Sequence, residues 1–189
     1  MFLSEIFSIL DARSFSSPWF WLVLISVWSL SGRGVLGVPN DVLYRAGRIL
    51  RDSAVSDPAE DTLLLDWLSL QLSRWRIPDT GGIILVAAGT CLLTVLFMLG
   101  FGFGLEMAQA MSLIMLPMAI LLVLRLRLAR RLQLVIDDAR QGASIRASTT
   151  EAMKYINRYR ALHMIISVVA ALVTTLWASL WMLLHPNGL

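Results

Sequence analysis

The sequence contains few of the residues from which catalytic centres, metal sites and disulfides are built. Among 189 residues there are two histidines and one cysteine, so no internal disulfide can form. His163 and His185 flank one apolar stretch, and about 33 Å of helix would separate them, too far to share a metal ion or haem. No Cys-x-x-Cys, His-Glu-x-x-His, Gly-x-Ser-x-Gly or phosphate-binding glycine loop is present. We therefore expect no catalytic residues, no metal and no cofactor, and a protein that is not an enzyme.

Charged side chains are also scarce, at 15% of the residues against 57% hydrophobic ones. The longest apolar stretch with few charges is residues 81–124, which carries one charged side chain, Glu106. About 20 apolar residues already cross the ~30 Å hydrocarbon core of a bilayer, so this stretch is long enough to cross twice. Three glycines between Gly100 and Gly104 each weaken a helix by about 1 kcal/mol relative to alanine and mark the turn. The pattern predicts two antiparallel transmembrane helices.

Two further apolar stretches complete the predicted membrane domain. The first of these stretches begins near residue 17 and is short for a span, but residues 35–38 lengthen it if the Arg33 side chain reaches to the membrane interface. The fold class we expect is all-α: a polytopic integral membrane protein with four transmembrane helices, forming a single membrane domain over residues 1–189. The predicted spans are about 17–37, 82–100, 105–125 and 162–184, and the predicted cytoplasmic loops are about 38–81 and 126–161.

The first loop contains two amphipathic patterns. One helix is expected to start at Asn40, and a second over residues 60–77 places leucines opposite its polar side chains. We expect these to be interfacial helices, with a docking face for another protein as the alternative. Residues 2–10 show a similar short stripe and are expected to lie in the headgroup region, with docking on a partner subunit as the alternative.

The second loop is predicted to form a helical hairpin stalk between the third and fourth spans. The third helix is expected to leave the bilayer and continue to about Gly142, a residue typical of helix ends. Residues 148–151 (Ser-Thr-Thr-Glu) match a capping box, and a helix that starts there runs into the last span without a breaker.

The distribution of basic residues sets the orientation. The N-terminal tail carries one Lys or Arg, the first loop six, the glycine turn none, the second loop nine and the C-terminal tail none. Four crossings place both loops on one side, and the positive-inside rule makes that side cytoplasmic. We therefore expect a multi-pass protein of the bacterial inner (plasma) membrane with both termini periplasmic. Arginine outnumbers lysine fifteen to one, which fits a GC-rich bacterial genome.

Four arginines follow the third span, and we expect them to contact anionic lipid headgroups on the cytoplasmic side. Each basic residue near such a surface is attracted by about 1 kcal/mol, which explains the basic loop without nucleic acid as a partner. The four are Arg125, Arg127, Arg130 and Arg131.

Glu106 and Gln109 are the candidates for a polar contact at membrane depth. Ionisable groups there are costly and often functional, so an ion, proton or polar partner is one interpretation. The other is structural, because Glu106 lies in the first turn of the third helix, where the helix dipole stabilises a carboxylate.

The last span carries small residues at every fourth position, and we predict that this face packs on another helix of the same chain or of a partner. The residues are Ser167, Ala171, Thr175 and Ser179.

Two functions fit these features. We expect a non-catalytic accessory, assembly or scaffold subunit of a larger bacterial inner-membrane complex, which acts through helix packing and amphipathic docking surfaces. Its partners would be membrane lipids and other membrane protein subunits. The alternative is a small homo-oligomeric transporter or channel in which Glu106 and Gln109 line a pathway.

Overall fold

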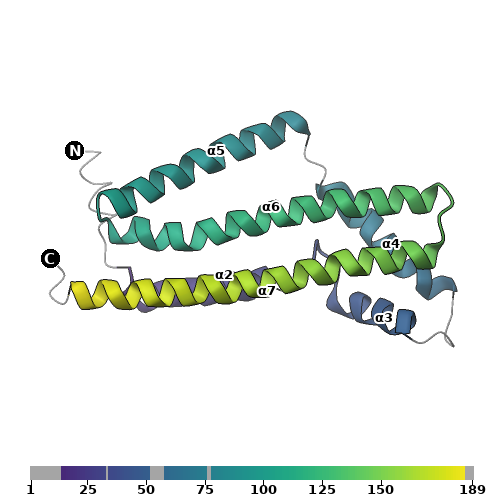
Figure 1. The fold of residues 1–189 in the computed structure, drawn as a ribbon, viewed down its shortest axis with the longest axis horizontal. Coiled ribbons are helices and arrows are strands. Elements are labelled where there is room, and N and C mark those ends of the chain that lie inside the picture. Colours follow the sequence, from purple (N-terminus) through teal and green to yellow (C-terminus); the bar gives the residue numbers. More distant parts are fainter. Residues whose placement is uncertain (1–13, 33, 52–57, 76–77, 186–189) are drawn as a thin grey trace. The chain divides into compact units, whose positions relative to one another are not determined.

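The computed structural model describes residues 14–32, 34–51, 58–75 and 78–185. All regular secondary structure in these ranges is helical, which confirms the predicted all-α class there (Figure 1). The short amphipathic helix expected over residues 2–10 lies outside the described ranges, as does Arg33. The elements are α2 (Pro18–Ser31), α3 (Asn40–Arg51), α4 (Pro58–Leu72), the 3-10 helix η1 (Ser73–Trp75), α5 (Asp79–Phe97), the π-helix η2 (Met98–Gly102), α6 (Glu106–Arg140) and α7 (Ile145–Leu184).

Three of the helices are long and apolar enough to cross a membrane. They are α5 with η2, where the apolar helix covers Thr80–Gly102, then α6 with 35 residues and α7 with 40. This composition supports a membrane protein. Helix α2 is apolar but has 14 residues, about 21 Å of helix against a hydrocarbon core of ~30 Å.

The predicted extension of the first span through residues 35–38 is wrong. These residues form a tight turn, in which the Val38 N–H donates to the Val35 carbonyl at 3.0 Å. Leu36 and Gly37 have φ values of 55° and 84°, which two successive residues of a right-handed helix cannot adopt. The three apolar side chains of the turn are at most 5% exposed. Their hydrophobicity therefore belongs to a protein core and not to a lipid-facing span.

The described chain forms two compact units. Unit 1 comprises Met1–Leu30, Asp79–Leu121 and Ile165–Leu189, and unit 2 comprises Ser31–Pro78 and Leu122–Met164. Helices α6 and α7 contribute residues to both. Unit 1 thus collects most of the residues predicted to lie in spans, and unit 2 most of those predicted to lie in cytoplasmic loops.

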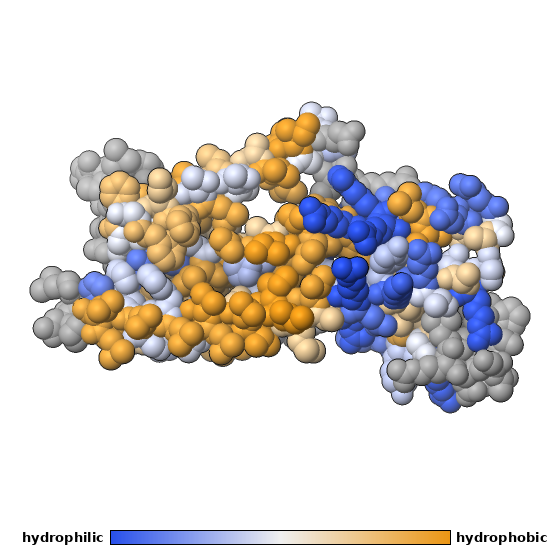
Figure 2. All heavy atoms as spheres, in the orientation of Figure 1, coloured by the Kyte–Doolittle hydropathy of each residue, from blue (hydrophilic) through white to orange (hydrophobic). Residues whose placement is uncertain are grey.

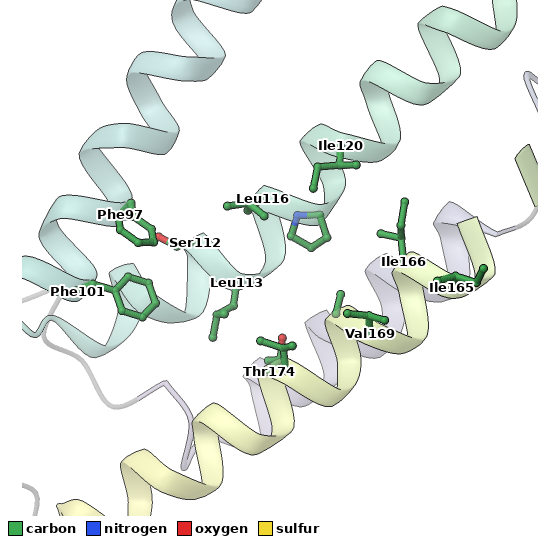
Figure 3. A pocket seen from close by; sticks show the side chains of 13 residues that line it. Phe97, Phe101, Ser112, Leu113, Leu116, Ile120, Ile165, Ile166, Val169 and Thr174 are labelled. Carbon is green, nitrogen blue, oxygen red and sulfur yellow. The ribbon is translucent and has the colours of Figure 1, made fainter. Parts of the chain in front are cut away.

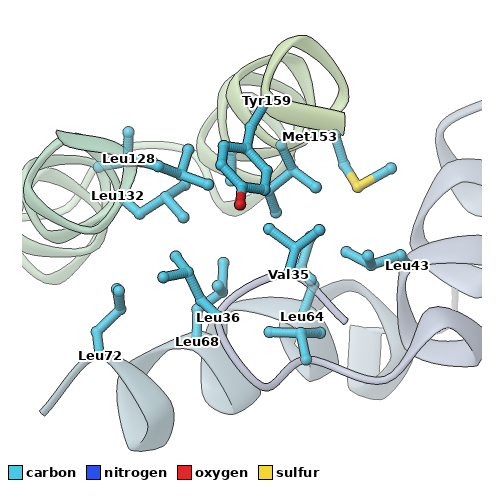
Figure 4. Packing of buried hydrophobic residues seen from close by; sticks show 14 of the residues in the cluster. Val35, Leu36, Leu43, Leu64, Leu68, Leu72, Leu128, Leu132, Met153 and Tyr159 are labelled. Atoms are coloured by element: carbon cyan, nitrogen blue, oxygen red, sulfur yellow. The ribbon is translucent and has the colours of Figure 1, made fainter. Parts of the chain in front are cut away.

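Unit 2 is built around a well-packed core of leucines (Figure 4). On α4, Leu64, Leu68 and Leu72 recur every four residues and are at most 2% exposed. They pack with the turn at residues 35–38 and with side chains of α3, α6 and α7 in the same unit. This corrects the expectation that the leucine face of the second amphipathic helix lies on the membrane surface, because the same chain covers that face.

Helices α6 and α7 are joined by a short turn, and one of the two helix boundaries differs from the prediction. Helix α6 ends at Arg140, and Gly142 follows with a φ of 102°, as expected for a helix-terminating glycine. Helix α7 already begins at Ile145, and the Ser148 N–H donates to the Ser144 carbonyl at 3.0 Å. Ser148 therefore lies inside the helix, and the predicted capping box there is wrong.

Unit 1 buries little of its apolar surface. Its core is a small cluster in which Phe15, Ala110 and Ala178 are buried. Helix α5 is the extreme case, since only 6% of the most apolar stretch of this helix is buried in the protein. The corresponding share for α6 is 33%. Figure 2 shows the hydrophobic surface gathered over α5 and over the unit 1 parts of α6 and α7. A surface of this kind requires lipid or protein to cover it.

The hairpin between α5 and α6 is closed by the predicted glycines. Helix α5 continues as the π-helix η2, and Gly104, with a φ of 73°, precedes α6. At Gly100 the backbones approach so closely that an added Cβ would lie 2.7 Å from the Gln109 nitrogen. Only glycine fits at that contact.

Candidate functional site

Glu106, the first residue of α6, joins two segments of unit 1 that are distant in the sequence. Its Oε1 accepts the backbone N–H groups of Ser14 at 2.6 Å and Phe15 at 2.5 Å. The residue is 8% exposed, so these charge-assisted hydrogen bonds are shielded from water. The carboxylate holds the segment that leads into α2 against the start of α6.

Gln109 lies one turn further along α6 and joins three elements of unit 1. Its Nε2 donates to the Gly100 carbonyl of η2 at 2.9 Å, and its Oε1 accepts the indole N–H of Trp177 on α7 at 2.9 Å. The side chain is 2% exposed. Both ends of the amide are therefore used in holding η2, α6 and α7 together.

An apolar pocket of about 440 Å³ lies among the helices of unit 1 (Figure 3). Phe97 and Phe101 form one side, Pro117 of α6 another, and α7 contributes residues that include Val169. Neither Glu106 nor Gln109 lines it. A lining of this kind accommodates an acyl chain or apolar side chains rather than an ion.

The small residues of α7 divide into a buried and an exposed row. Thr174 and Ala178 are 1% and 0% exposed, and they pack within unit 1. Thr175 and Ser179 of the predicted packing face are exposed, and each hydroxyl donates to a carbonyl of its own helix. The other two residues of that face, Ser167 and Ala171, are half-buried. The row buried within this chain is thus that of Thr174 and Ala178, and packing of the predicted face on another helix stays a prediction.

Arg125 stands at the centre of a polar cluster in unit 2. Its Nη2 donates to the Ser31 carbonyl at 2.6 Å, and its Nε donates to the Tyr159 hydroxyl at 2.8 Å. The Ser31 hydroxyl lies 3.0 Å from Nε2 of His163. Ser31 is the last residue of α2, where the partial negative charge of the helix end favours a cation. The half-buried Arg125 is therefore turned toward the protein.

The other three predicted headgroup arginines are exposed on α6. The guanidinium carbon of Arg131 lies 5.5 Å from the centre of the Tyr155 ring, within the range of a cation–π contact. The Tyr155 hydroxyl donates to Glu151 at 3.0 Å, and this hydrogen bond raises the pKa of the Tyr155 phenol above its ordinary value. The phenol therefore stays neutral, and its ring offers a fixed face to Arg131.

Sequence reasoning missed Ser31 and Tyr159 as partners of Arg125, and His163 as the partner of Ser31. The hydrogen bond between Ser31 and His163 spans 132 positions of the chain, so no local spacing could reveal it. A serine beside a histidine is part of the arrangement that hydrolases use, but such chemistry also needs an orienting acid and an oxyanion hole. The described residues contain no group of three His, Cys, Asp or Glu side chains that could hold a metal ion.

Comparison of the chain with protein-family models, with curated proteins and with solved structures finds no match. Its function must therefore be argued from its own residues.

Proposed function

We propose that this chain is a non-catalytic accessory, assembly or scaffold subunit of a larger protein complex in the bacterial inner membrane. The observation that carries the proposal is a face of small residues on α5 that the rest of the chain leaves uncovered. It consists of Ala87, Thr90, Cys91 and Thr94, all exposed. On a helix these positions lie opposite Leu96, which is 7% exposed and faces the protein.

A small-residue face has a specific meaning inside a bilayer. Lipid tails are as apolar as leucine, so transmembrane helices associate by close backbone packing, which small side chains allow. Lipid alone gives no reason to place alanine and threonine on the outward side of α5. The Thr94 hydroxyl donates to the Thr90 carbonyl at 2.8 Å, so its polar group is already satisfied within the helix. The face is thus suited to a second helix.

The proposed topology has four crossings, with both large loops cytoplasmic and both termini periplasmic. Unit 2 carries fifteen of the sixteen basic residues, the exception being Arg13. A fourth crossing by α2 is supported by one hydrogen bond at each of its ends. In unit 1, Phe15, just before α2, donates to Glu106, and in unit 2, Ser31, the last residue of α2, accepts from Arg125.

A transporter with Glu106 and Gln109 in its pathway is less well supported. Both side chains are buried, and their described hydrogen bonds join segments of the same unit. The nearby pocket is apolar and does not include them. These contacts account for both residues without a transported ion.

The test is photo-crosslinking in the native membrane. A photoreactive amino acid at Thr90 should give a discrete crosslinked band, while the same group at Leu92, on another face of α5, should give none or a much weaker one. Mass spectrometry of the band and of a mild detergent extract then identifies the partner and its stoichiometry. A lone, monodisperse protomer with no crosslink at Thr90 would contradict the proposal. A crosslink only to a second copy of the chain would favour a homo-oligomer.

A further inference from the structure

A second pocket, in unit 2, combines three arginines with an apolar wall. Its volume is about 200 Å³, and it lies between the parts of α6 and α7 that belong to this unit. Arg127 and Arg131 line it from α6, and Arg158 lines it from α7. Leu124 and Leu162 are among the residues that complete its wall.

None of the three guanidinium groups makes an ion pair in the described part of the chain, and no acidic side chain lines the pocket. The ion pair found there joins Arg140 to Asp137, and neither residue lines this pocket. Arg131 is positioned by the ring of Tyr155, whose hydroxyl is bonded to Glu151. Three like charges around one small pocket repel one another, so the pocket favours an anion. The planar fork of an arginine matches the oxygens of a phosphate group, to which it can donate two parallel hydrogen bonds.

The apolar wall identifies the kind of anion. Leu162 at the pocket is 37% exposed, and Met164, further along α7, is 69% exposed. On α6, Leu122 and Val123 just before the pocket are 38% and 45% exposed. A phosphate bound by the arginines would therefore lie next to an apolar surface, which a soluble phosphate does not use and a lipid does.

We propose that this pocket binds the phosphodiester of an anionic phospholipid, with the acyl chains along the exposed apolar residues of α6 and α7. Basic pockets between helices at the cytoplasmic surface are known to select such headgroups. The inference rests on the proposed membrane placement of the chain. The sequence predicts headgroup contacts for four arginines that follow the third span. The proposed site differs from that set, because it includes Arg158 of α7 and leaves out Arg125, which is bonded to Ser31 and Tyr159.

The experiment is native mass spectrometry of the delipidated full-length protein in detergent. Phosphatidylglycerol, phosphatidylcholine and glycerol 3-phosphate are titrated separately, and the fraction of protein that carries one bound molecule is measured. The test variant is Arg127→Gln/Arg158→Gln. The matched control is Arg130→Gln/Arg160→Gln, which removes the same charge from the same two helices at exposed positions that do not line the pocket.

We expect one phosphatidylglycerol per protomer, bound more tightly than phosphatidylcholine or glycerol 3-phosphate. The test variant should weaken this binding by about tenfold or more and the control by less than about twofold, because only the test pair removes direct hydrogen bonds to phosphate. Arg131→Lys, which keeps the charge but loses the fork, should weaken binding more than Arg130→Lys does.

Three results would overturn the inference. Equal losses in the test and control pairs would reduce the arginines to a diffuse basic surface. Equal binding of phosphatidylcholine would remove the selectivity for an anion, and preferential binding of glycerol 3-phosphate would assign the site to a soluble phosphate. None of these results bears on crosslinking at Thr90, so the inference can fail while the proposed function stands.

Discussion

The Glu106 carboxylate accepts the backbone N–H of Phe15, which lies 91 positions earlier in the chain. Phe15 itself is 1% exposed, so this hydrogen bond lies in the interior of unit 1. The contact fixes where the chain enters α2 relative to the start of α6. It gives the one charged side chain between residues 81 and 124 a structural role.

Replacing Glu106 should destabilise unit 1. Glu106→Ala leaves two buried or half-buried N–H groups without their acceptor, and the expected cost is about 2–4 kcal/mol. Glu106→Gln keeps a neutral oxygen acceptor and should cost clearly less. The measurement is the thermal unfolding midpoint in detergent. If Glu106 served a transporter mechanism, Glu106→Gln would abolish flux in reconstituted vesicles even where the thermal midpoint is preserved.

Gly100→Ala should separate η2 from α6. The new Cβ would lie 2.7 Å from the Gln109 nitrogen and 3.0 Å from the Ala108 carbonyl carbon, so the backbones must move apart. We expect a loss of about 1–3 kcal/mol, typical of overpacking. Gly102→Ala is the matched control, since its Cβ would meet nothing within 4 Å. The two midpoints are compared in one detergent, and equal midpoints would show that the close approach does not determine stability.

These two glycines also show how far the sequence determines the fold. The apolar stretch at residues 81–124 and its glycines predict the α5–α6 hairpin, because only a turn fits so long an apolar segment into a bilayer. The spacing cannot tell that Gly100 is the site of a backbone contact while Gly102 faces open space. That distinction depends on the position of α6.

The turn at residues 35–38 and the cluster around Arg125 show why the rest could not be predicted. Apolar composition is the same for a residue that faces lipid and one that faces a leucine core, so the sequence predicts a span where the structure has a turn. Arg125 stands among three other arginines and has no local feature that distinguishes it. Its acceptors on Ser31 and Tyr159 lie 94 and 34 positions away.

Arg125→Lys should destabilise unit 2 although the charge is kept. The guanidinium uses Nε for Tyr159 and Nη2 for Ser31, and a single ammonium cannot reproduce this fork. We expect a loss of about 1–3 kcal/mol, since a half-buried acceptor loses a charged donor. Arg130→Lys, at an exposed position of the same helix, should change little. Limited proteolysis of the stalk and the thermal midpoint both report the difference, and equal behaviour of the two variants would contradict this role for Arg125.

Four crossings predict a specific pattern of surface labelling. In a Cys91→Ser background, single cysteines are placed at Ser16, at Phe103 and at Tyr44, all of which are exposed. A membrane-impermeant maleimide added to cells with a permeabilised outer membrane should label positions 16 and 103 and leave position 44 unlabelled until the inner membrane is broken. The two N–H groups that Glu106 accepts place residues 14 and 15 close to the start of α6, just after Phe103, so positions 16 and 103 should behave alike. Labelling at 103 without labelling at 16 would mean that α2 does not cross. The protein would then have three spans, and the hydrogen bonds between Glu106 and the segment before α2 would have to be absent in the membrane.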